Sequence, residues 1–204
     1  MKKMEFSMII GMAGAIVISS WTQFTGSLFD LQENVLRLHI LANSDSMEDQ
    51  LLKYEVRDSL IEASEDIFGT EYDSSNIIEE NVIDKLPLIK QIAEKTIKEN
   101  GFSYSVTAEL VNMEFDAREY EDITMPAGFY DAVRVTIGEA KGQNWWCVMY
   151  PPLCVPTALD VESDKDIEKD CFTKDERKLL HHPEQYEVKF KCVEWFKKLS
   201  SKWS

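Results

Sequence analysis

The sequence predicts an α+β fold, in which a mixed, mainly antiparallel sheet carries two to three helices on it. Three observations predict this class. Residues 35–41 and 129–137 alternate between apolar and polar side chains, as half-buried strands do. Residues 46–68 carry apolar side chains at helical spacing. Hydrophobic residues make up 44% of the 204-residue chain, which suits a packed domain and is too much for a disordered acidic chain.

The first 27 residues have the layout of a signal peptide or a membrane anchor. Lys2 and Lys3 precede an uncharged, largely apolar run over residues 6–18, and small and polar residues follow it. This run is short for a membrane-spanning helix, which needs about 20 apolar residues. Cleavage after Ser19 or Ser27 and retention as an anchor both stay open, and a buried N-terminal helix is the alternative to export.

The first helix of the domain is expected from Ser46 to about Phe68. Ser46 and Asp49 have the spacing of a capping box, in which a hydroxyl and a carboxylate bond to each other's backbone N–H groups. The apolar residues of this helix form one stripe, because they are spaced by three and four positions. The stripe consists of Leu52, Val56, Leu60, Ala63 and Ile67.

A second helical region should follow a linker at residues 69–76 and end at Asn100. A break is expected near Pro87, because proline removes a backbone donor from the helix interior. Gly101 supplies the C-terminal stop.

The strand at 35–41 places Leu36, Leu38 and Ile40 on one face and Arg37 and His39 on the other. A solvent-facing surface is the simplest interpretation of the Arg37 face, and a contact or polar network is the alternative. Further strands, a hairpin loop at 139–143 and a terminal helix with Trp195 complete the fold. The further strands are expected at residues 103–115, 129–137, 144–150 and 186–192.

Charge divides the chain into unequal parts. The formal net charge is -15, which argues against a nucleic-acid partner because such proteins need clustered Lys and Arg. Acidic residues gather between residues 30 and 131, whereas residues 143–159 carry no charge. We therefore expect a signal or anchor at 1–27 and an α+β domain at 30–154. Residues 155–204 are expected to hold a charged connector, a final strand and an amphipathic helix.

Four cysteines, at positions 147, 154, 171 and 192, allow three pairings into two disulfides. We favour a bond between Cys147 and Cys154, which flank Pro151 and Pro152. Small buried hydrophobes are the alternative interpretation of these cysteines. No pair has zinc-finger spacing, and no phosphate-binding glycine loop is present, so neither a metal nor a cofactor is expected.

Catalysis is the weaker functional prediction. An exported hydrolase acting on the cell wall or on peptides would use His39 as a general base, with a nearby serine and acid such as Ser44 and Asp45. The serines lie in a turn before a helix, which already explains them, and no G-x-S-x-G elbow exists.

A contact surface is the stronger prediction, since tryptophan and tyrosine dominate interface hot spots. We expect one tryptophan of the pair at 145 and 146 to pack inward, and the other to be exposed together with Tyr150 and the proline loop. The candidate contact residues are Arg37, His39, Asn43, Asp45, Tyr130, Arg134, Asn144, Trp145, Trp146, Tyr150, Pro151 and Pro152.

Two stretches resemble the signature blocks of the stage II sporulation protein R family of endospore-forming Firmicutes. They are VLRLHILANSDSMEDQLLKYEVRD at 35–58 and MPAGFYDAVRVTIGEAKGQNWWCVMYPPLC at 125–154. The second is the more specific, because NWWCVMYPPLC joins rare residue types in one order. The chain after Val155 has no pattern that matches.

The resemblance implies a secreted signal rather than an enzyme. Members of the family are made in the forespore and exported into the space between the two septal membranes. There they activate a membrane-embedded aspartic protease of the mother cell, stage II sporulation protein GA, which processes pro-sigma-E. The resemblance thus implies a protein partner, and membrane contact only through the N-terminal segment.

Overall fold

The computed structural model describes residues 2–68, 78–120, 123–151 and 172–186, together with Lys189, Lys191, Cys192 and Trp195. A four-stranded sheet lies at its centre, in the order β2-β5-β1-β6. Strand β1 (Leu36–Leu41) runs parallel to β5 (Gly128–Ile137) and antiparallel to β6 (Asn144–Tyr150), and β2 (Val106–Phe115) is antiparallel to β5. The predicted α+β class with a mixed, mainly antiparallel sheet is confirmed.

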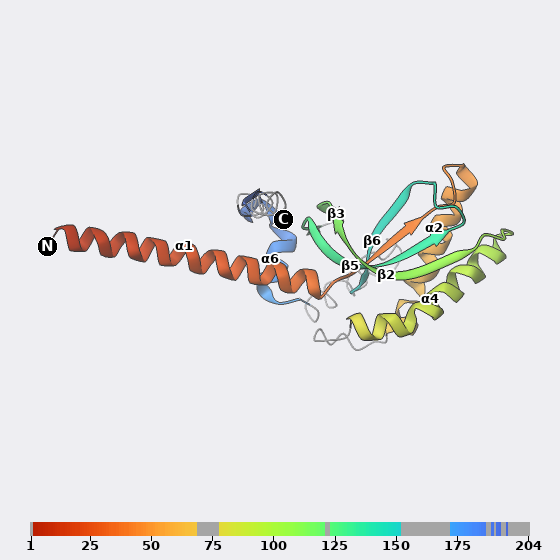
Figure 1. The fold of residues 1–204 in the computed structure, drawn as a ribbon, viewed down its shortest axis with the longest axis horizontal. Helices are drawn as coiled ribbons and strands as arrows, with labels where there is room; N and C mark the ends of the chain where they lie inside the picture. The colour runs from red at the N-terminus through yellow and green to blue at the C-terminus, as the bar shows by residue number, and fades with distance from the viewer. Residues whose placement is uncertain are drawn as a thin grey trace, which may run out of the picture.

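Helices cover one face of this sheet (Figure 1). They are α2 (Met47–Glu62), the short α3 (Ser64–Phe68) and α4 (Ile78–Glu99). The predicted apolar stripe of α2 points at the sheet, and the core between the two layers is formed by aliphatic side chains from both. Its fully buried members include Leu36, Leu38, Ile40, Val56, Leu60, Ile89, Ala93, Val133 and Val135.

The helices differ in two details from the prediction. The single helix expected over 46–68 is divided at Ala63 into α2 and α3. The break expected near Pro87 is wrong, because α4 continues through this residue. Pro87 lies on the exposed side of α4, so water can bond the carbonyl group that loses its partner, and the buried side of the helix holds its course.

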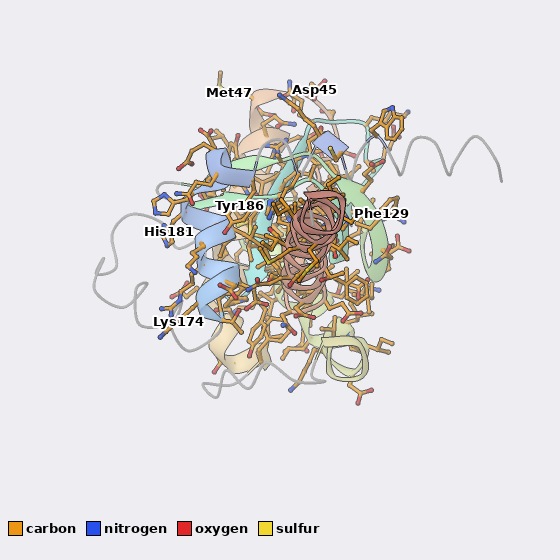
Figure 2. The ribbon with its side chains drawn as sticks, turned by 90° about the vertical axis from the view of Figure 1, so that its left-hand side faces the viewer. Asp45, Met47, Phe129, Lys174, His181 and Tyr186 are labelled. Carbon is orange, nitrogen blue, oxygen red and sulfur yellow. The ribbon has the colours of Figure 1, made fainter. Side chains whose placement is uncertain are left out.

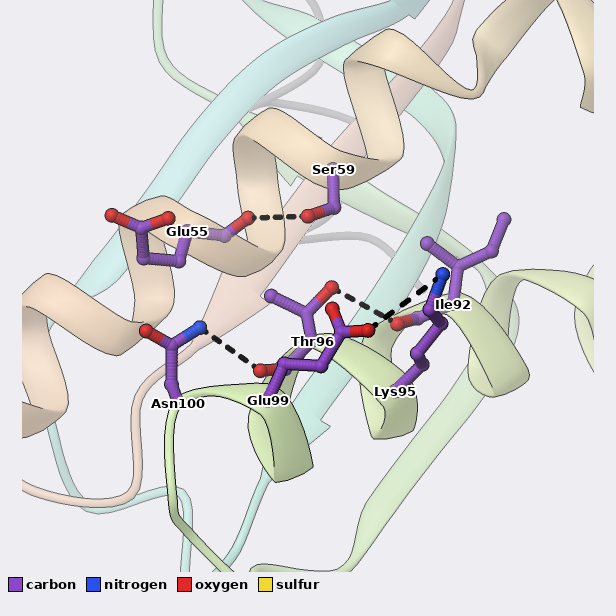
Figure 3. Close-up of polar contacts among 7 residues, drawn as sticks. All are labelled: Glu55, Ser59, Ile92, Lys95, Thr96, Glu99 and Asn100. Carbon is purple, nitrogen blue, oxygen red and sulfur yellow. Dashed lines mark hydrogen bonds and ion pairs between the residues drawn. The ribbon is translucent and has the colours of Figure 1, made fainter.

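The C-terminus of α4 follows the prediction. Gly101 has a φ of 82°, and the N–H groups of Gly101 and Phe102 donate to the carbonyls of Lys98 and Ile97 at 3.0 Å each. This is a Schellman ending, which glycine adopts without steric cost. Figure 3 shows the last turns of α4 beside α2. The hydroxyl groups of Ser59 and Thr96 donate to carbonyls within their own helices at 3.0 and 3.1 Å.

The hairpin expected at residues 139–143 is wrong. Strands β5 and β6 do not pair with each other, because β1 lies between them. The connection instead crosses the end of β1, where the N–H groups of Lys141 and Gly142 donate to the carbonyls of Asn43 and Ala42 at 3.1 and 3.0 Å. The loop therefore holds the start of α2 against the sheet.

The second face of the sheet is covered only in part. Strands β3 (Arg118–Tyr120) and β4 (Ile123–Met125) form a hairpin in a region that the sequence predicts as loop. This hairpin, the end of α1 (Lys2–Glu33) and α6 (Lys174–His181) pack over the amino-terminal half of β1. The second core contains Leu31, Val35, Phe115, Ile123, Met125, Tyr130, Ala132, Val148, Phe172 and Leu180.

The last strand, expected at 186–192, is wrong as well. Tyr186 ends a 3₁₀ turn, η1 (Pro183–Tyr186), and Lys189, Lys191 and Cys192 are helical. The ring of Tyr186 stacks on Phe24 of α1 with centroids 5.5 Å apart. Tyr186 thus meets a helix and not a sheet edge, and the described residues that follow it are helical, so the alternation of this segment does not produce a strand. Trp195 of the expected terminal helix is helical, and the other residues of that helix lie outside the described part.

The N-terminal segment forms one continuous helix, α1, that runs past residue 27 to Glu33. From Ser7 to Glu33 it is long and apolar enough to cross a membrane. Its first half extends away from the domain (Figure 1), and the aliphatic side chains there, such as Ile16 and Val17, are more than half exposed. Farther along, Phe24, Leu28 and Leu31 are buried. The second half of α1 is therefore built into the folded domain.

Candidate functional site

The Arg37 face of β1 is buried, so its expected exposure to solvent is wrong. Arg37 has an exposed fraction of 0%. The reason is the β3–β4 hairpin, because Tyr120 of β3 accepts a hydrogen bond from Nη2 of Arg37 at 2.7 Å. The guanidinium carbon lies 4.3, 5.1 and 5.9 Å from the ring centroids of Phe115, Tyr130 and Tyr120. Three aromatic rings thus surround a buried cation.

The bonding of Arg37 is incomplete. Its Nε and Nη1 atoms have no hydrogen-bond partner, and no carboxylate of the described residues forms an ion pair with it. Burial lowers the pKa of Arg37, and the nearby Tyr120 and Tyr130 oppose this effect. A buried ion without an opposite charge is costly for stability, and rings at these distances recover only part of that cost.

His39 lies two residues further along the same face, with only 4% of its surface exposed. Its ring stacks on Trp146 of β6 at a centroid distance of 3.9 Å and an interplanar angle of 4°. Among the described residues neither ring nitrogen meets the geometric criteria for a hydrogen bond. Burial lowers the pKa of His39, although Asn144 lies near enough to raise it in part, so the ring is neutral at pH 7.

The groups that the hydrolase hypothesis needs lie elsewhere, at the start of α2. Ser44 donates to Oδ2 of Asp49 at 2.5 Å, and Ser46 accepts from the Asp49 N–H at 3.2 Å. Asp45 accepts from the Gln143 N–H at 2.7 Å. All four side chains hold the turn together, and within the described residues none of their hydrogen bonds reaches His39. The geometry gives catalysis by His39 no support.

This turn shows what the candidate residue Asn43 does. The side-chain amide of Asn43 donates from Nδ2 to Asp49 at 2.8 Å, and its Oδ1 accepts from the Glu139 N–H at 2.9 Å. The predicted capping box is therefore half formed, because the carboxylate of Asp49 bonds to side chains before the helix. Burial raises the pKa of Asp49, but hydrogen bonds from Ser44, Asn43 and Tyr104 outweigh it and lower the pKa. Asn43 and Asp45 fix the β1–α2 connection to the β5–β6 loop.

The two tryptophans of β6 point to opposite faces of the sheet, and both are half-buried. Trp145 meets Tyr54 of α2 edge-on at 5.3 Å, and the guanidinium carbon of Arg57 lies 4.7 Å from its ring centroid. Trp146 stacks on His39 and meets Phe115 at 4.9 Å. The expectation that one tryptophan packs inward and the other is exposed is wrong, since each ring has one covered side.

The exposed proline loop is also wrong as far as the structure describes it. Tyr150 is 7% exposed and packs against Phe68 at 5.4 Å, and Pro151 is buried. Pro152 lies outside the described residues. The carboxyl half of β6 is thus core, which explains why it has no charge.

Cys147 is buried on β6 and takes part in a disulfide, whereas Cys192 has a free thiol. Cys154 and Cys171 lie outside the described residues, so the pairing of Cys147 with Cys154 stays a prediction.

The remaining candidates divide between core and surface. Tyr130 is buried and donates to the Pro126 carbonyl at 2.7 Å, and burial raises its pKa. Arg134 is partly exposed and forms an ion pair with Glu109 at 2.9 Å, and Asn144 is exposed. In the described ranges no group of three or more His, Cys, Asp or Glu side chains is arranged to hold a metal ion.

Two further residues, Tyr54 and Arg57, complete the exposed end of β6, and sequence reasoning missed them. We define the β6 surface as Trp145 of β6 with Tyr54 and Arg57 of α2, which lie on the helix-covered face of the sheet. Asn144, Trp146 and Arg134 lie on the opposite face, with His39. The apolar stripe marks the buried positions of α2. The aromatic and cationic residues that flank this stripe were therefore the sequence signal by which Tyr54 and Arg57 could have been found. Phe115 and Tyr120 of the Arg37 site were missed because they follow β1 by about 80 residues, and Tyr120 also lies outside the strands that the sequence predicts.

Comparisons with known proteins agree with the resemblance of the two sequence blocks. No solved structure matches the chain. The stage II sporulation protein R of Bacillus subtilis (strain 168) is 34% identical over 190 residues, and the match covers 84% of each chain. The model of the family described as stage II sporulation protein R matches residues 32–160, a range that contains the whole sheet. The chain belongs to the stage II sporulation protein R family.

Proposed function

We propose that this protein is the exported signal of endospore formation that activates the membrane-embedded aspartic protease, stage II sporulation protein GA. The protease then processes pro-sigma-E in the mother cell. Family membership over most of the chain carries the proposal, and the exposed apolar half of α1 fits an export signal or anchor. In this function the protein acts as a ligand and not as a catalyst.

The β6 surface is the contact surface that we propose for the protease. Trp145, Arg57 and Tyr54 form a packed, partly exposed group, in which Tyr54 meets Trp145 edge-on. Tryptophan, tyrosine and arginine are the residue types that contribute most to binding at interfaces. Rings already held by neighbours lose little side-chain entropy on binding.

The test is reconstitution of the full chain with membranes that contain the protease and pro-sigma-E. Addition of the protein should increase precursor cleavage, and no increase would contradict the proposed function. Trp145→Ala and Arg57→Ala should each reduce cleavage at least tenfold, the effect of losing an interface residue worth about 1.4 kcal/mol or more.

Phe129→Ala is the matched control, because Phe129 is a large side chain that is 50% exposed on β5 and lies outside the β6 surface. Thermal unfolding of each variant separates loss of contact from loss of fold. Equal cleavage with Trp145→Ala and the wild type would exclude the β6 surface while leaving the signalling function intact.

A further inference from the structure

The position of the domain relative to α1 is fixed by the helix itself. α1 is continuous to Glu33, so no linker separates its apolar half from the domain. Residues 6–24 of an α-helix span about 28 Å, close to the hydrocarbon thickness of about 30 Å. If this part of α1 crosses a membrane, the surface of the bilayer lies near Phe24.

The C-terminal part of the described chain packs at that level. Helix α6 meets α1 through Gln23, which donates to Asp175 at 2.9 Å, and through Phe24, which is buried with Leu28 and Leu179. Lys189 donates to the hydroxyl of Ser20 at 2.8 Å. Figure 1 shows α6 crossing α1 rather than following it. An upright α1 would therefore place α6 along the plane of the bilayer.

Figure 2 looks at the molecule from the N-terminal side, where such a membrane would lie. Helix α6 stands beside the end-on ribbon of α1, with Lys174 near one end and His181 near the other, and Tyr186 lies next to α1. The elements that carry these residues lie next to one another on the side of the molecule that would face the membrane.

The charge of this part differs from the rest of the protein. Residues 172–204 carry eight basic and five acidic side chains, against 14 and 32 in the remaining chain. The described residues of this range hold five basic side chains, at positions 174, 177, 178, 189 and 191, and three acidic ones, at positions 175, 176 and 184. The part that packs against α1 is therefore positive in an otherwise strongly acidic protein. Trp195, which is 59% exposed, belongs to the same segment, and tryptophan prefers the membrane interface.

An open pocket of about 200 Å³ lies where these elements meet. Its lining consists of Ser20, Gln23, Phe24, Ser27, Asp175, Lys178, Leu179, Tyr186 and Lys189. Lys189 lies 5.3 and 5.5 Å from the ring centroids of Phe24 and Tyr186, and Lys178 is 59% exposed and bonded to Asp175. Two ammonium groups against one carboxylate leave the pocket with a net positive charge, and its hydroxyl groups and apolar floor suit the polar and apolar parts of an anionic phospholipid headgroup region.

We propose that this surface binds the anionic phospholipid headgroups of the membrane that holds α1. Lys178 and Lys189 contact lipid phosphate groups, and α6 lies along the bilayer. An acidic protein without such a contact would be repelled by an anionic membrane surface. The basic segment instead holds one end of the domain against the bilayer, and α1 provides the anchor. This contact is independent of the protease.

The test uses the full chain in lipid nanodiscs, without the protease, and measures amide hydrogen exchange of residues 174–186. Exchange should be about fivefold slower or more in discs with about 30% phosphatidylglycerol than in pure phosphatidylcholine, the factor that one lysine near an anionic surface contributes. The difference should vanish in about 0.5 M salt. Equal exchange in the two lipids would overturn the proposal.

Lys178→Gln with Lys189→Gln should abolish the difference, whereas Lys90→Gln with Lys95→Gln on α4 should preserve it. The control removes the same charge from lysines that also form surface ion pairs. Lys189→Gln also removes the hydrogen bond to Ser20, which could loosen the packing of α6 on α1. The single variant Lys178→Gln keeps that bond, and its hydrogen exchange in phosphatidylcholine discs, compared with that of the wild type, shows whether the packing is retained. A lipid effect that persists in the double variant would overturn the proposal. Equal protection by about 10 mM inorganic phosphate in phosphatidylcholine discs would assign the pocket to free phosphate and overturn the lipid assignment.

Discussion

Replacement of Arg37 by methionine should make the protein more stable while it removes a buried cation. The structure gives the contributions. The Arg37→Met variant lacks the charge-assisted hydrogen bond to Tyr120, which contributes about 2 kcal/mol. It also lacks the contacts of the cation with the rings of Phe115 and Tyr130, which contribute about 2 kcal/mol together. The burial penalty of an ion without an opposite charge is several kcal/mol, taken here as about 6 kcal/mol. Arg37→Met should therefore raise the free energy of unfolding by about 2 kcal/mol.

The assay is thermal unfolding of the full chain in detergent, followed by near-ultraviolet circular dichroism. About 2 kcal/mol corresponds to an increase in Tm of about 4 to 8 °C for a domain of this size. Arg134→Met is the control, because Arg134 forms a partly exposed ion pair with Glu109 and such pairs contribute about 0 to 1 kcal/mol. A destabilisation by Arg37→Met of 2 kcal/mol or more would refute the reasoning, since the rings would then outweigh desolvation.

Three further predictions concern ionisation and backbone geometry, and one concerns α1. The pKa of Asp49 is lowered in the folded state, so Asp49→Asn should cost about 1 to 2 kcal/mol at pH 7. The cost should become progressively smaller as the pH falls below about 4. Urea unfolding at pH 7 and below pH 4 measures the difference. The pKa of His39 is lowered as well, so stability should fall as the pH decreases below about 6.5, and the same titration of His39→Phe should lack this component. Gly138→Ala places a Cβ at φ 58° within 2.2 Å of a side-chain oxygen. It should destabilise the protein by more than Gly101→Ala, whose Cβ meets no atom within 4 Å and which costs about 1 kcal/mol. Equal decreases in Tm for the two variants would contradict this. Removal of residues 1–27 takes away buried Phe24 and should cost about 3 kcal/mol, whereas removal of residues 1–19 should leave the Tm unchanged.

The sequence was sufficient for the pattern within each element and insufficient for the neighbours of each element. The spacing of Leu52, Val56 and Leu60 gave the buried side of α2 correctly, because helical periodicity is local. Alternation in β1 assigned Arg37 to the right face, but what covers that face is the β3–β4 hairpin, about 80 residues away. In the same way, the alternation of β5 and β6 does not encode that β1 separates them. Both errors have one cause: periodicity shows which side of an element is apolar, but not which other element packs against it or pairs with it.

The uncharged stretch at 143–159 changes meaning once β6 is placed. Its described carboxyl half, residues 147–150, is buried against α2, α3 and the second core. Lack of charge there follows from packing and is not a sign of binding. The part of β6 that stays accessible is the Asn144 end, which contains both tryptophans.

The direction of β6 connects the two proposals. Its first residue, Asn144, pairs with Leu41 at the end of β1, and Tyr150 pairs with Leu36 next to α1. Six strand residues span about 20 Å, so the β6 surface lies at the end of the sheet away from α1 (Figure 1). With α1 anchored and α6 on the bilayer, the basic end of the protein faces its own membrane and the aromatic β6 surface projects away from it. We expect this orientation to present the contact surface to a partner in an opposing membrane, which is the geometry that signalling between two adjacent membranes requires.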